Sequence, residues 1–335
     1  MFLEAAQAPS VVREQLKANA QQLRELGQRL RRHPPRAVVT CARGSSDHAA
    51  TYAKYLLEAH ANVLTSSAAP SLSSIYEARP DLSDVLFIAI SQSGKSPDLL
   101  AAMRKAKASG AMTVALCNTR ESPLMELADH AVPLHAGVEL SVAATKSYIA
   151  SLSCIAQLTA HWSGNQELLG SLEALPDQLA QSWECDWSAA VEALEHAVNL
   201  FVIARGFGLG VAQEAALKFK ETCGLHAEAF SAAEVKHGPM ALVRERFPVL
   251  MFAQHDDTHC DIETLAKDFA LRGARVFVAG LTSSTARSLP AVSAQAEMEP
   301  ILRIQSFYRM ANALALARGL NPDAPPHLNK ITETL

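Results

Sequence analysis

The chain has 335 residues, 49% of them hydrophobic, which is long and apolar enough for two domains with separate cores. Its net charge of −4 comes from interspersed acidic and basic residues, which argues against a basic surface for nucleic acid or for a membrane. No apolar run is long enough to span a bilayer, the start lacks an export signal, and the six cysteines are scattered without CxxC spacing. We therefore expect a cytoplasmic protein with a small-molecule partner.

The first predicted elements are a long helix and a strand–turn–helix unit. Residues 8–32 predict an amphipathic helix with Ser10 as its N-cap. Two prolines then precede a short apolar strand at 37–41, and a helix over 47–60 follows a turn rich in glycine and serine.

The same unit recurs at 85–108 and at 113–128, where Ser96 and Ser122 each precede a proline at the first helical position. Such alternation predicts a parallel, doubly wound α/β sheet with helices on both faces. The remaining elements of the first half are a strand at 129–134, a loop at 138–145, a helix at 146–162 and a helical linker at 163–190.

Residues 85–97 contain the most informative of these turns. A buried apolar strand leads into Ser91-Gln92-Ser93-Gly94, and Ser96 caps a helix that begins at Pro97. The free N–H groups and the dipole at this helix start favour an anion, and the serine hydroxyls add hydrogen-bond donors. The stretch predicts a phosphate-binding loop. An ordinary serine-capped turn is the alternative.

The second half of the sequence repeats the first. Strand 113–117 aligns with residues 276–279, and the order of strands, turns and helices agrees along both copies. We therefore expect two tandem domains of one fold. In the second copy, Gln254-His255-Asp256-Asp257 stands where the first has residues 91–94, and its carboxylates repel phosphate. Only the first copy is expected to bind the anion.

These patterns divide the chain into five parts. They are an N-terminal helical segment (1–32), a first domain (33–165), a helical linker (166–190), a second domain (191–320) and a C-terminal tail (321–335).

Two stretches of the second half carry groups that can move protons. Residues 211–229 predict a helix on which Lys218 and Glu221 are three residues apart on one face. Residues 234–239 place His237 in a loop closed by Gly-Pro, and histidine titrates near neutral pH. A surface ion pair and a solvated histidine are the alternatives.

Two other stretches match ligand-binding motifs only in part. His255 and His259 are four residues apart but lack a second group of metal ligands at a suitable spacing. The glycines of residues 206–210 follow a strand, but Val211 occupies the sixth position of the dinucleotide-binding pattern. We therefore expect neither a metal nor a cofactor.

Seven segments together resemble the isomerase half of glucosamine-6-phosphate synthase, which is a pair of sugar isomerase (SIS) domains, and the glutamine-independent deaminases of the same superfamily. The resemblance covers nearly the whole chain. The segments are Arg43-Gly44-Ser45-Ser46, Ser91-Gln92-Ser93-Gly94, Val142-Ala143-Ala144-Thr145-Lys146, Ala216-Leu217-Lys218-Phe219-Lys220-Glu221, His226-Ala227-Glu228, Glu234-Val235-Lys236-His237-Gly238-Pro239 and Leu328-Asn329-Lys330.

The resemblance implies a role for each matching residue. Glu221 looks like the base that moves a proton between C2 and C1, and Lys218 like its polarising partner. His237 would open the sugar ring in the neighbouring subunit of a homodimer with shared active sites. Lys330, in a tail that reaches the active site, would bind the ketose as an imine. The residues implied in substrate binding are Gly44, Ser45, Ser46, Ser91, Gln92, Ser93 and Ser96 for the phosphate, and Val142 and Ala143 for the sugar.

The expected function is that of a deaminase that converts glucosamine 6-phosphate to fructose 6-phosphate and ammonia without a cofactor. The synthases carry a glutaminase ahead of the isomerase half, whereas this sequence begins at the first helix, so we expect free ammonia as the product. The sequence also departs from the synthase pattern at Ala42-Arg43 and in the tail at 323–327. The alternatives are a galactosamine-type substrate, an amino-acid adduct cleaved by a deglycase, and a non-catalytic sugar-phosphate sensor.

Overall fold

A computed structural model describes residues 1–76 and 80–330, which fold as two compact units. The first unit contains residues 10–139, 146–173 and the tail from Asn329. The second unit contains residues 1–9, 140–145 and 174–328. The last five residues of the predicted tail, 331–335, lie outside the described residues.

The first unit is built on a five-stranded, entirely parallel sheet with the strand order β2-β1-β3-β4-β5. Its strands are β1 (Ala37–Cys41), β2 (Thr65–Ser67), β3 (Val85–Ser91), β4 (Met112–Cys117) and β5 (His130–Pro133). Its helices are α2 (Ala8–Arg32), α3 (Ser45–Ala61), α4 (Pro70–Ser74), α5 (Pro97–Ala108), α6 (Pro123–Leu127), α7 (Lys146–Ser163) and α8 (Gln166–Trp183), the first and last of which extend into the second unit.

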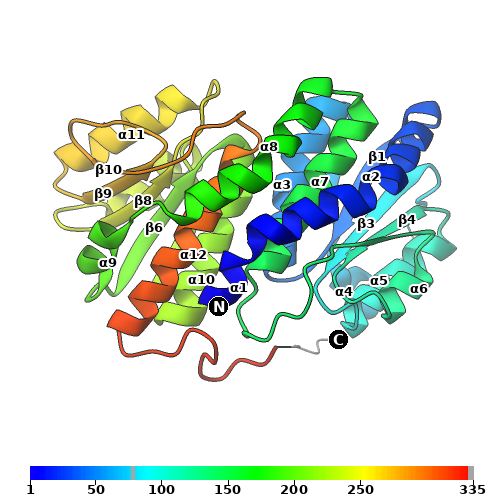
Figure 1. Ribbon diagram of the computed structural model, residues 1–335, viewed down its shortest axis with the longest axis horizontal. Coiled ribbons are helices and arrows are strands. Elements are labelled where there is room, and N and C mark those ends of the chain that lie inside the picture. The colour runs from blue at the N-terminus through cyan, green and yellow to red at the C-terminus, as the bar shows by residue number, and fades with distance from the viewer. Residues whose placement is uncertain (77–79, 331–335) are drawn as a thin grey trace. The chain divides into compact units, whose positions relative to one another are not determined.

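Helices cover both faces of this sheet, so its central strand is buried throughout (Figure 1). On one face, Phe87 of β3 and Ala115 of β4 pack with Leu99 and Met103 of α5. On the other face lie α3 and α7 (Figure 1). The doubly wound parallel arrangement predicted from the sequence is therefore confirmed.

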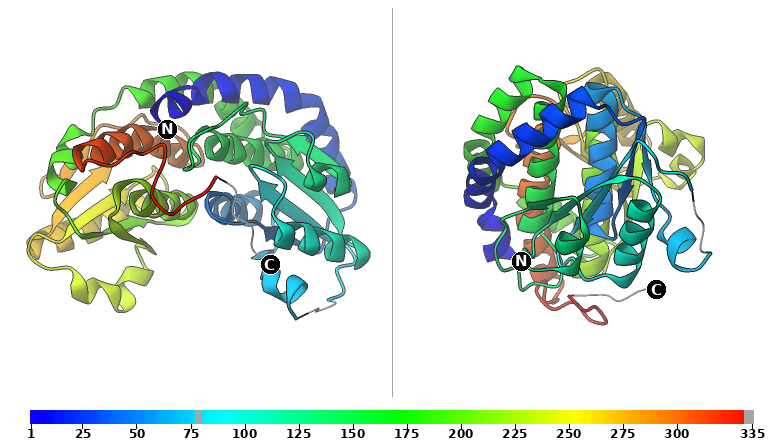
Figure 2. Two further views of the ribbon diagram at one scale, coloured as in Figure 1. Left: turned by 90° about the horizontal axis from the view of Figure 1, so that it is seen from below. Right: turned by 90° about the vertical axis from the view of Figure 1, so that its right-hand side faces the viewer.

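The second unit repeats this topology, with the strand order β7-β6-β8-β9-β10. Helices α10 and α12 lie on one face of its sheet and α11 on the other (Figure 2, left). The strands are β6 (Asn199–Ala204), β7 (His226–Ser231), β8 (Pro248–Phe252), β9 (Arg275–Ala279) and β10 (Arg287–Leu289). The helices are α1 (Phe2–Ala6), α9 (Ser188–Leu194), η1 (Gly206–Gly208), α10 (Leu209–Cys223), η2 (Glu234–His237), η3 (Pro239–Leu242), α11 (His259–Leu271) and α12 (Glu299–Ala317).

Three local predictions need correction. Ser10 is not an N-cap, because α2 already begins at Ala8. Helix α3 begins at Ser45, so the helix predicted from residue 47 starts two residues earlier. The helix predicted over 211–229 ends at Cys223, where Gly224 adopts a left-handed conformation (φ 57°), and the following residues form strand β7.

No helix within residues 1–76 and 80–330 combines the length and the apolar character needed to cross a bilayer.

Candidate active site

The predicted phosphate loop lies at the point where the strand order of the first sheet reverses. The chain passes from β1 to β2 on one side and from β3 to β4 on the other, and in open parallel α/β sheets the ligand-binding crevice lies at such a point, outside the carboxyl ends of the strands. Arg43, after β1, joins the two loops, because its guanidinium donates to the buried Asp98 of α5 at 2.7 and 2.8 Å. Residues 43–46 and 91–98 are thereby held together.

Ser91 and Ser93 shape the turn after β3. The Ser91 hydroxyl accepts a hydrogen bond from the Gly94 N–H at 2.9 Å, and the Ser93 hydroxyl accepts one from the Lys95 N–H at 3.3 Å. These two N–H groups therefore bind side-chain oxygens of the turn, although each serine keeps its own hydroxyl proton for donation. The turn itself requires glycine, since Gly94 has a φ of 67° and a Cβ there would lie 2.3 Å from Ser122 Oγ.

We expect Gly94→Ala to destabilise the first unit by about 1–3 kcal/mol, because it adds left-handed strain to a steric clash. The displaced loop should also raise KM for a phosphorylated substrate. Thermal unfolding and initial-rate kinetics test both effects. Gly170→Ala is the matched control, since Gly170 lies in α8 with nothing within 4 Å of an added Cβ. Equal behaviour of the two variants would contradict this account of the turn.

Four other predicted phosphate ligands lie at the starts of α3 and α5 or in the turn after β3. Gly44 is the N-cap of α3 in a left-handed conformation (φ 55°), and Ser45 and Ser46 form the first turn of that helix. Ser96 is the N-cap of α5, but its side chain makes no capping bond. Within residues 1–76 and 80–330, the side chains of Ser45, Ser46, Gln92 and Ser96 have no hydrogen-bond partner. They provide uncommitted donors at the crevice.

At the corresponding place in the second sheet, the side chains bond to one another and to the backbone. Arg205 and Asp261 are joined at 2.5 Å, in the same way as Arg43 and Asp98. The Gln254 amide donates to the Arg205 carbonyl at 3.0 Å and to Asp256 at 2.9 Å. The predicted asymmetry between the two copies thus has a structural counterpart: hydroxyl donors in the first crevice, an amide and a carboxylate in the second.

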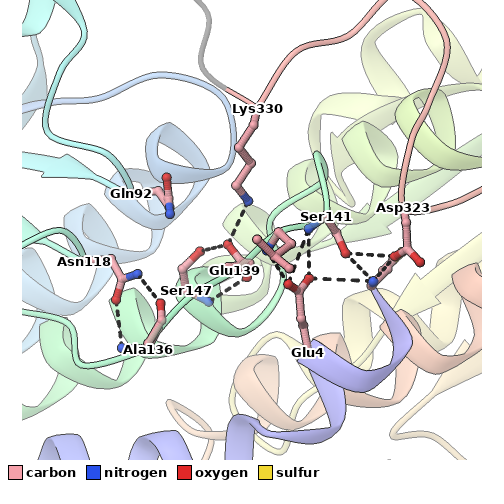
Figure 3. Close-up of polar contacts among 12 residues, drawn as sticks. Glu4, Gln92, Asn118, Ala136, Glu139, Ser141, Ser147, Asp323 and Lys330 are labelled. Atoms are coloured by element: carbon pink, nitrogen blue, oxygen red, sulfur yellow. Dashed lines mark hydrogen bonds and ion pairs between the residues drawn. The ribbon is translucent and has the colours of Figure 1, made fainter.

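The predicted sugar-lining residues, Val142 and Ala143, lie in the loop between β5 and α7, within the second unit. The Val142 N–H donates to the Asp323 carbonyl at 3.1 Å, which joins this loop to the C-terminal tail. The Asp323 carboxylate accepts from the Ser141 hydroxyl at 2.8 Å, and the Glu4 carboxylate accepts from the Leu140 and Ser141 N–H groups (Figure 3). Burial raises the pKa of the Glu4 carboxyl group. The hydrogen bonds from Leu140 and Ser141 have the opposite and larger combined effect, so the pKa lies below its ordinary value.

Lys330 lies in the first unit, where its ammonium group contacts Glu139 at 3.2 Å. The Glu139 side chain is fully buried, and its carboxylate also accepts from the Ser147 hydroxyl at 2.6 Å and from the Ser147 N–H at 3.2 Å. Figure 3 shows the Lys330 side chain reaching Glu139, with the Gln92 side chain drawn from the predicted phosphate loop of the same unit. Lys330 and the predicted phosphate loop therefore belong to one compact unit.

The predicted Lys218–Glu221 pair is not a surface ion pair. Lys218 lies on the inner face of α10 with its side chain 1% exposed, whereas that of Glu221 is 22% exposed. The Lys218 ammonium bonds to Glu221 and lies 3.4 Å from the buried carboxylate of Glu214. Glu214 in turn accepts a hydrogen bond from the Tyr308 hydroxyl at 3.1 Å.

The charge of Lys218 is maintained by its neighbours. Burial lowers the pKa of Lys218, but the carboxylates of Glu214 and Glu221 more than offset this effect, and its pKa lies above the ordinary value. A permanent cation thus holds a carboxylate that still reaches solvent, which is an arrangement suited to a general base.

His237 is the last residue of η2 and is exposed. In the part of the chain that the structure describes, no hydrogen bond or ion pair joins His237 to Lys218 or Glu221. Lys218 and Glu221 are thus two predicted catalytic residues that the structure brings into contact.

The two incomplete ligand motifs have other local partners. His255 Nδ1 lies 2.7 Å from Glu299, and His259 Nδ1 lies 3.0 Å from the Gln254 carbonyl. Among residues 1–76 and 80–330, no group of three or more His, Cys, Asp or Glu side chains is arranged to hold a metal ion. Gly206–Gly208 form the short helix η1 that leads into α10.

Three site features were not predicted from the sequence: Glu139, Glu214 and the Arg43–Asp98 pair. Glu214 could have been found, since it lies four residues before Lys218 on the same helix. The other two contacts join residues 55 or more positions apart, and no local pattern indicates them.

Comparison with known proteins supports one family assignment for both halves of the chain. A family model described as the SIS domain matches residues 33–161 and again residues 193–316. A glutamine–fructose-6-phosphate aminotransferase (isomerizing) from Symbiobacterium thermophilum is 34% identical over 316 residues, covering 88% of this chain and 51% of the relative. The chain thus spans about half the length of such relatives.

Solved structures match over nearly the whole chain. One from Silicibacter pomeroyi, described as a phosphosugar isomerase, has a TM-score of 0.93 and 42% identity, covering 96% of this chain and 99% of that chain. A glucosamine-6-phosphate deaminase from Thermotoga maritima has a TM-score of 0.75 and 22% identity, covering 97% of this chain and 100% of that chain. The second likeness is one of fold alone.

Proposed function

Because the chain belongs to the SIS domain family, we propose that it is an aldose–ketose isomerase that acts on an amino-sugar phosphate and releases ammonia. The proposed reaction converts glucosamine 6-phosphate and water to fructose 6-phosphate and ammonia. The observation that carries this proposal is the buried, charged Lys218 that holds the partly exposed carboxylate of Glu221. Such a pair supplies a general base without a metal or a cofactor.

The proposed mechanism consists of proton transfers followed by a hydrolysis. His237 assists ring opening, which exposes the C1 aldehyde and acidifies the proton on C2. Glu221 removes that proton, leaving an enol with an amino group on C2, and returns it to C1. The product is a C2 imine, and water hydrolyses it to the ketose and ammonia. Lys330 is proposed to bind the ketose through an imine at C2.

Phosphate binding is assigned to the first domain. The uncommitted donors of Ser45, Ser46, Gln92 and Ser96, with the hydroxyl protons of Ser91 and Ser93, suit the three oxygens of a phosphate. Gly44 allows the backbone to approach the ligand closely, since nothing lies within 4 Å of where its Cβ would be. Val142 and Ala143 are proposed to line the sugar.

The names of similar proteins favour this class of substrate. The matched relative from Symbiobacterium thermophilum, 34% identical, is named for fructose 6-phosphate. A panel of glucosamine, galactosamine and fructosamine 6-phosphates, assayed for ammonia and ketose, tests the choice. Ammonia release from the galactosamine or fructosamine compound alone would support the proposed reaction type but assign it to a different substrate. Binding of every compound without turnover would indicate a sugar-phosphate sensor.

We further propose a homodimer in which His237 completes the partner subunit's active site. The Glu221→Gln and His237→Ala variants should each be inactive alone. After subunit exchange, a heterodimer would have one intact site, so an equal mixture should regain about a quarter of wild-type activity. No recovery, despite exchange demonstrated by mass spectrometry, would show that each chain builds its own site.

The buried, unpaired cysteines suit a reducing compartment, and we propose the cytoplasm.

A further inference from the structure

Glu139 combines a fully buried side chain with a carboxylate whose contacts include three hydrogen-bond donors. Two donors come from Ser147, in the first turn of α7, at 2.6 Å from the hydroxyl and 3.2 Å from the N–H. The third is the Lys330 ammonium at 3.2 Å. A buried carboxylate is costly unless it is hydrogen-bonded and paired with a cation, and this one meets both conditions.

The loop that carries Glu139 is itself fixed to the sheet. The Asn118 amide, directly after β4, donates to the Gly137 carbonyl at 2.8 Å, and its oxygen accepts from the Ala136 N–H at 2.8 Å (Figure 3). Ser147 anchors the carboxylate from the other side, where the positive end of the α7 dipole also favours it. The loop is thus fixed by Asn118, and the Glu139 carboxylate by Ser147, independently of Lys330.

The two ends of the Lys330–Glu139 pair differ in exposure. The Glu139 side chain is 0% exposed and the Lys330 side chain 25% exposed. The carboxylate thus acts as an interior anchor while the amine remains accessible from solvent.

We propose that Glu139 is a positioning residue that holds the Lys330 amine in a fixed place within the first unit. This inference rests on the proposed function, in which the Lys330 amine bonds to C2 of the ketose. Glu139 touches Lys330 rather than the substrate, so its contribution to turnover passes through that lysine.

Chemical labelling tests the contact without reference to activity. We expect brief acetylation of the full chain, quantified by mass spectrometry, to modify Lys330 at least threefold faster in Glu139→Gln than in the wild type. Ser147→Ala, which removes one bond to the carboxylate, should give a smaller increase. Lys54, exposed on α3, is the internal control and should be modified equally in all three proteins. An unchanged rate at Lys330 in both variants would overturn the proposed contact.

Kinetics test the role of that contact. Glu139→Gln should lower kcat for ammonia release about tenfold with little change in KM, and the same substitution in a Lys330→Ala background should have no further effect. An equal loss in both backgrounds would overturn the positioning role. If Lys330→Ala is itself fully active, the tail lysine has no part in the reaction, and the proposal fails even where the labelling result holds. If the wild type turns over none of the amino-sugar phosphates, the proposed function fails instead.

Discussion

Glu221→Gln should lower kcat by about 100-fold or more and leave KM for the sugar phosphate nearly unchanged, because the substitution removes only the group that takes the C2 proton. Glutamine keeps the size of the side chain, and its amide oxygen can still accept the hydrogen bond from Lys218. The proposed phosphate ligands belong to the first domain and are unchanged in this variant. Loss of turnover without loss of binding is the signature of a residue that acts in the chemical step.

The matched control is Glu192→Gln, which neutralises an exposed carboxylate on α9. It should show wild-type kinetics and the same melting temperature. Turnover of Glu221→Gln within a factor of about three of the wild type would remove Glu221 from the mechanism, since general bases contribute much more than that.

Lys218→Met should destabilise the second unit by about 3–5 kcal/mol, the usual effect of removing one partner from a buried ion pair. The Glu214 side chain is fully buried. The substitution removes its ion pair with the Lys218 ammonium and retains its hydrogen bond from the Tyr308 hydroxyl. Activity should also fall, because the Glu221 carboxylate loses its anchor. Thermal unfolding measured alongside kinetics separates the two effects.

Lys220→Met is the control, because Lys220 is exposed on the same helix, two residues further on. A second variant tests the physical cause. Adding Glu214→Gln to Lys218→Met removes the uncompensated buried charge and should restore much of the lost stability. If the double variant is as unstable as Lys218→Met, the cost arises from packing rather than from charge.

The strand, turn and helix around residues 85–97 could be predicted because their signals are local. An apolar strand, a glycine turn and the Ser96-Pro97 pair are adjacent in sequence, and the structure places β3 and α5 at those residues. The use of the serines differs from the prediction in one respect. Ser91 and Ser93 accept bonds from the turn's own N–H groups, so they shape the loop as well as offering hydroxyl protons.

The contacts that complete the site could not be predicted, because they join distant parts of the chain. Arg43 meets Asp98 only because β1 and β3 are neighbours in the sheet, and Lys330 meets Glu139 only because the tail returns to the first unit. The helix predicted over 211–229 failed for a different reason. Its helical pattern continues past Gly224, but the left-handed turn at that glycine ends the helix and β7 pairs with β6 instead.

The most direct measurement of the proposed reaction is simultaneous assay of ammonia and fructose 6-phosphate from glucosamine 6-phosphate supplied as the sole substrate. The account predicts that the wild-type protein forms the two products in equal amounts, that a chelator has no effect on the rate, and that Glu221→Gln forms neither at a comparable rate. Fructose 6-phosphate formed without ammonia, ammonia formed equally well by Glu221→Gln, or no product from the wild type would contradict it.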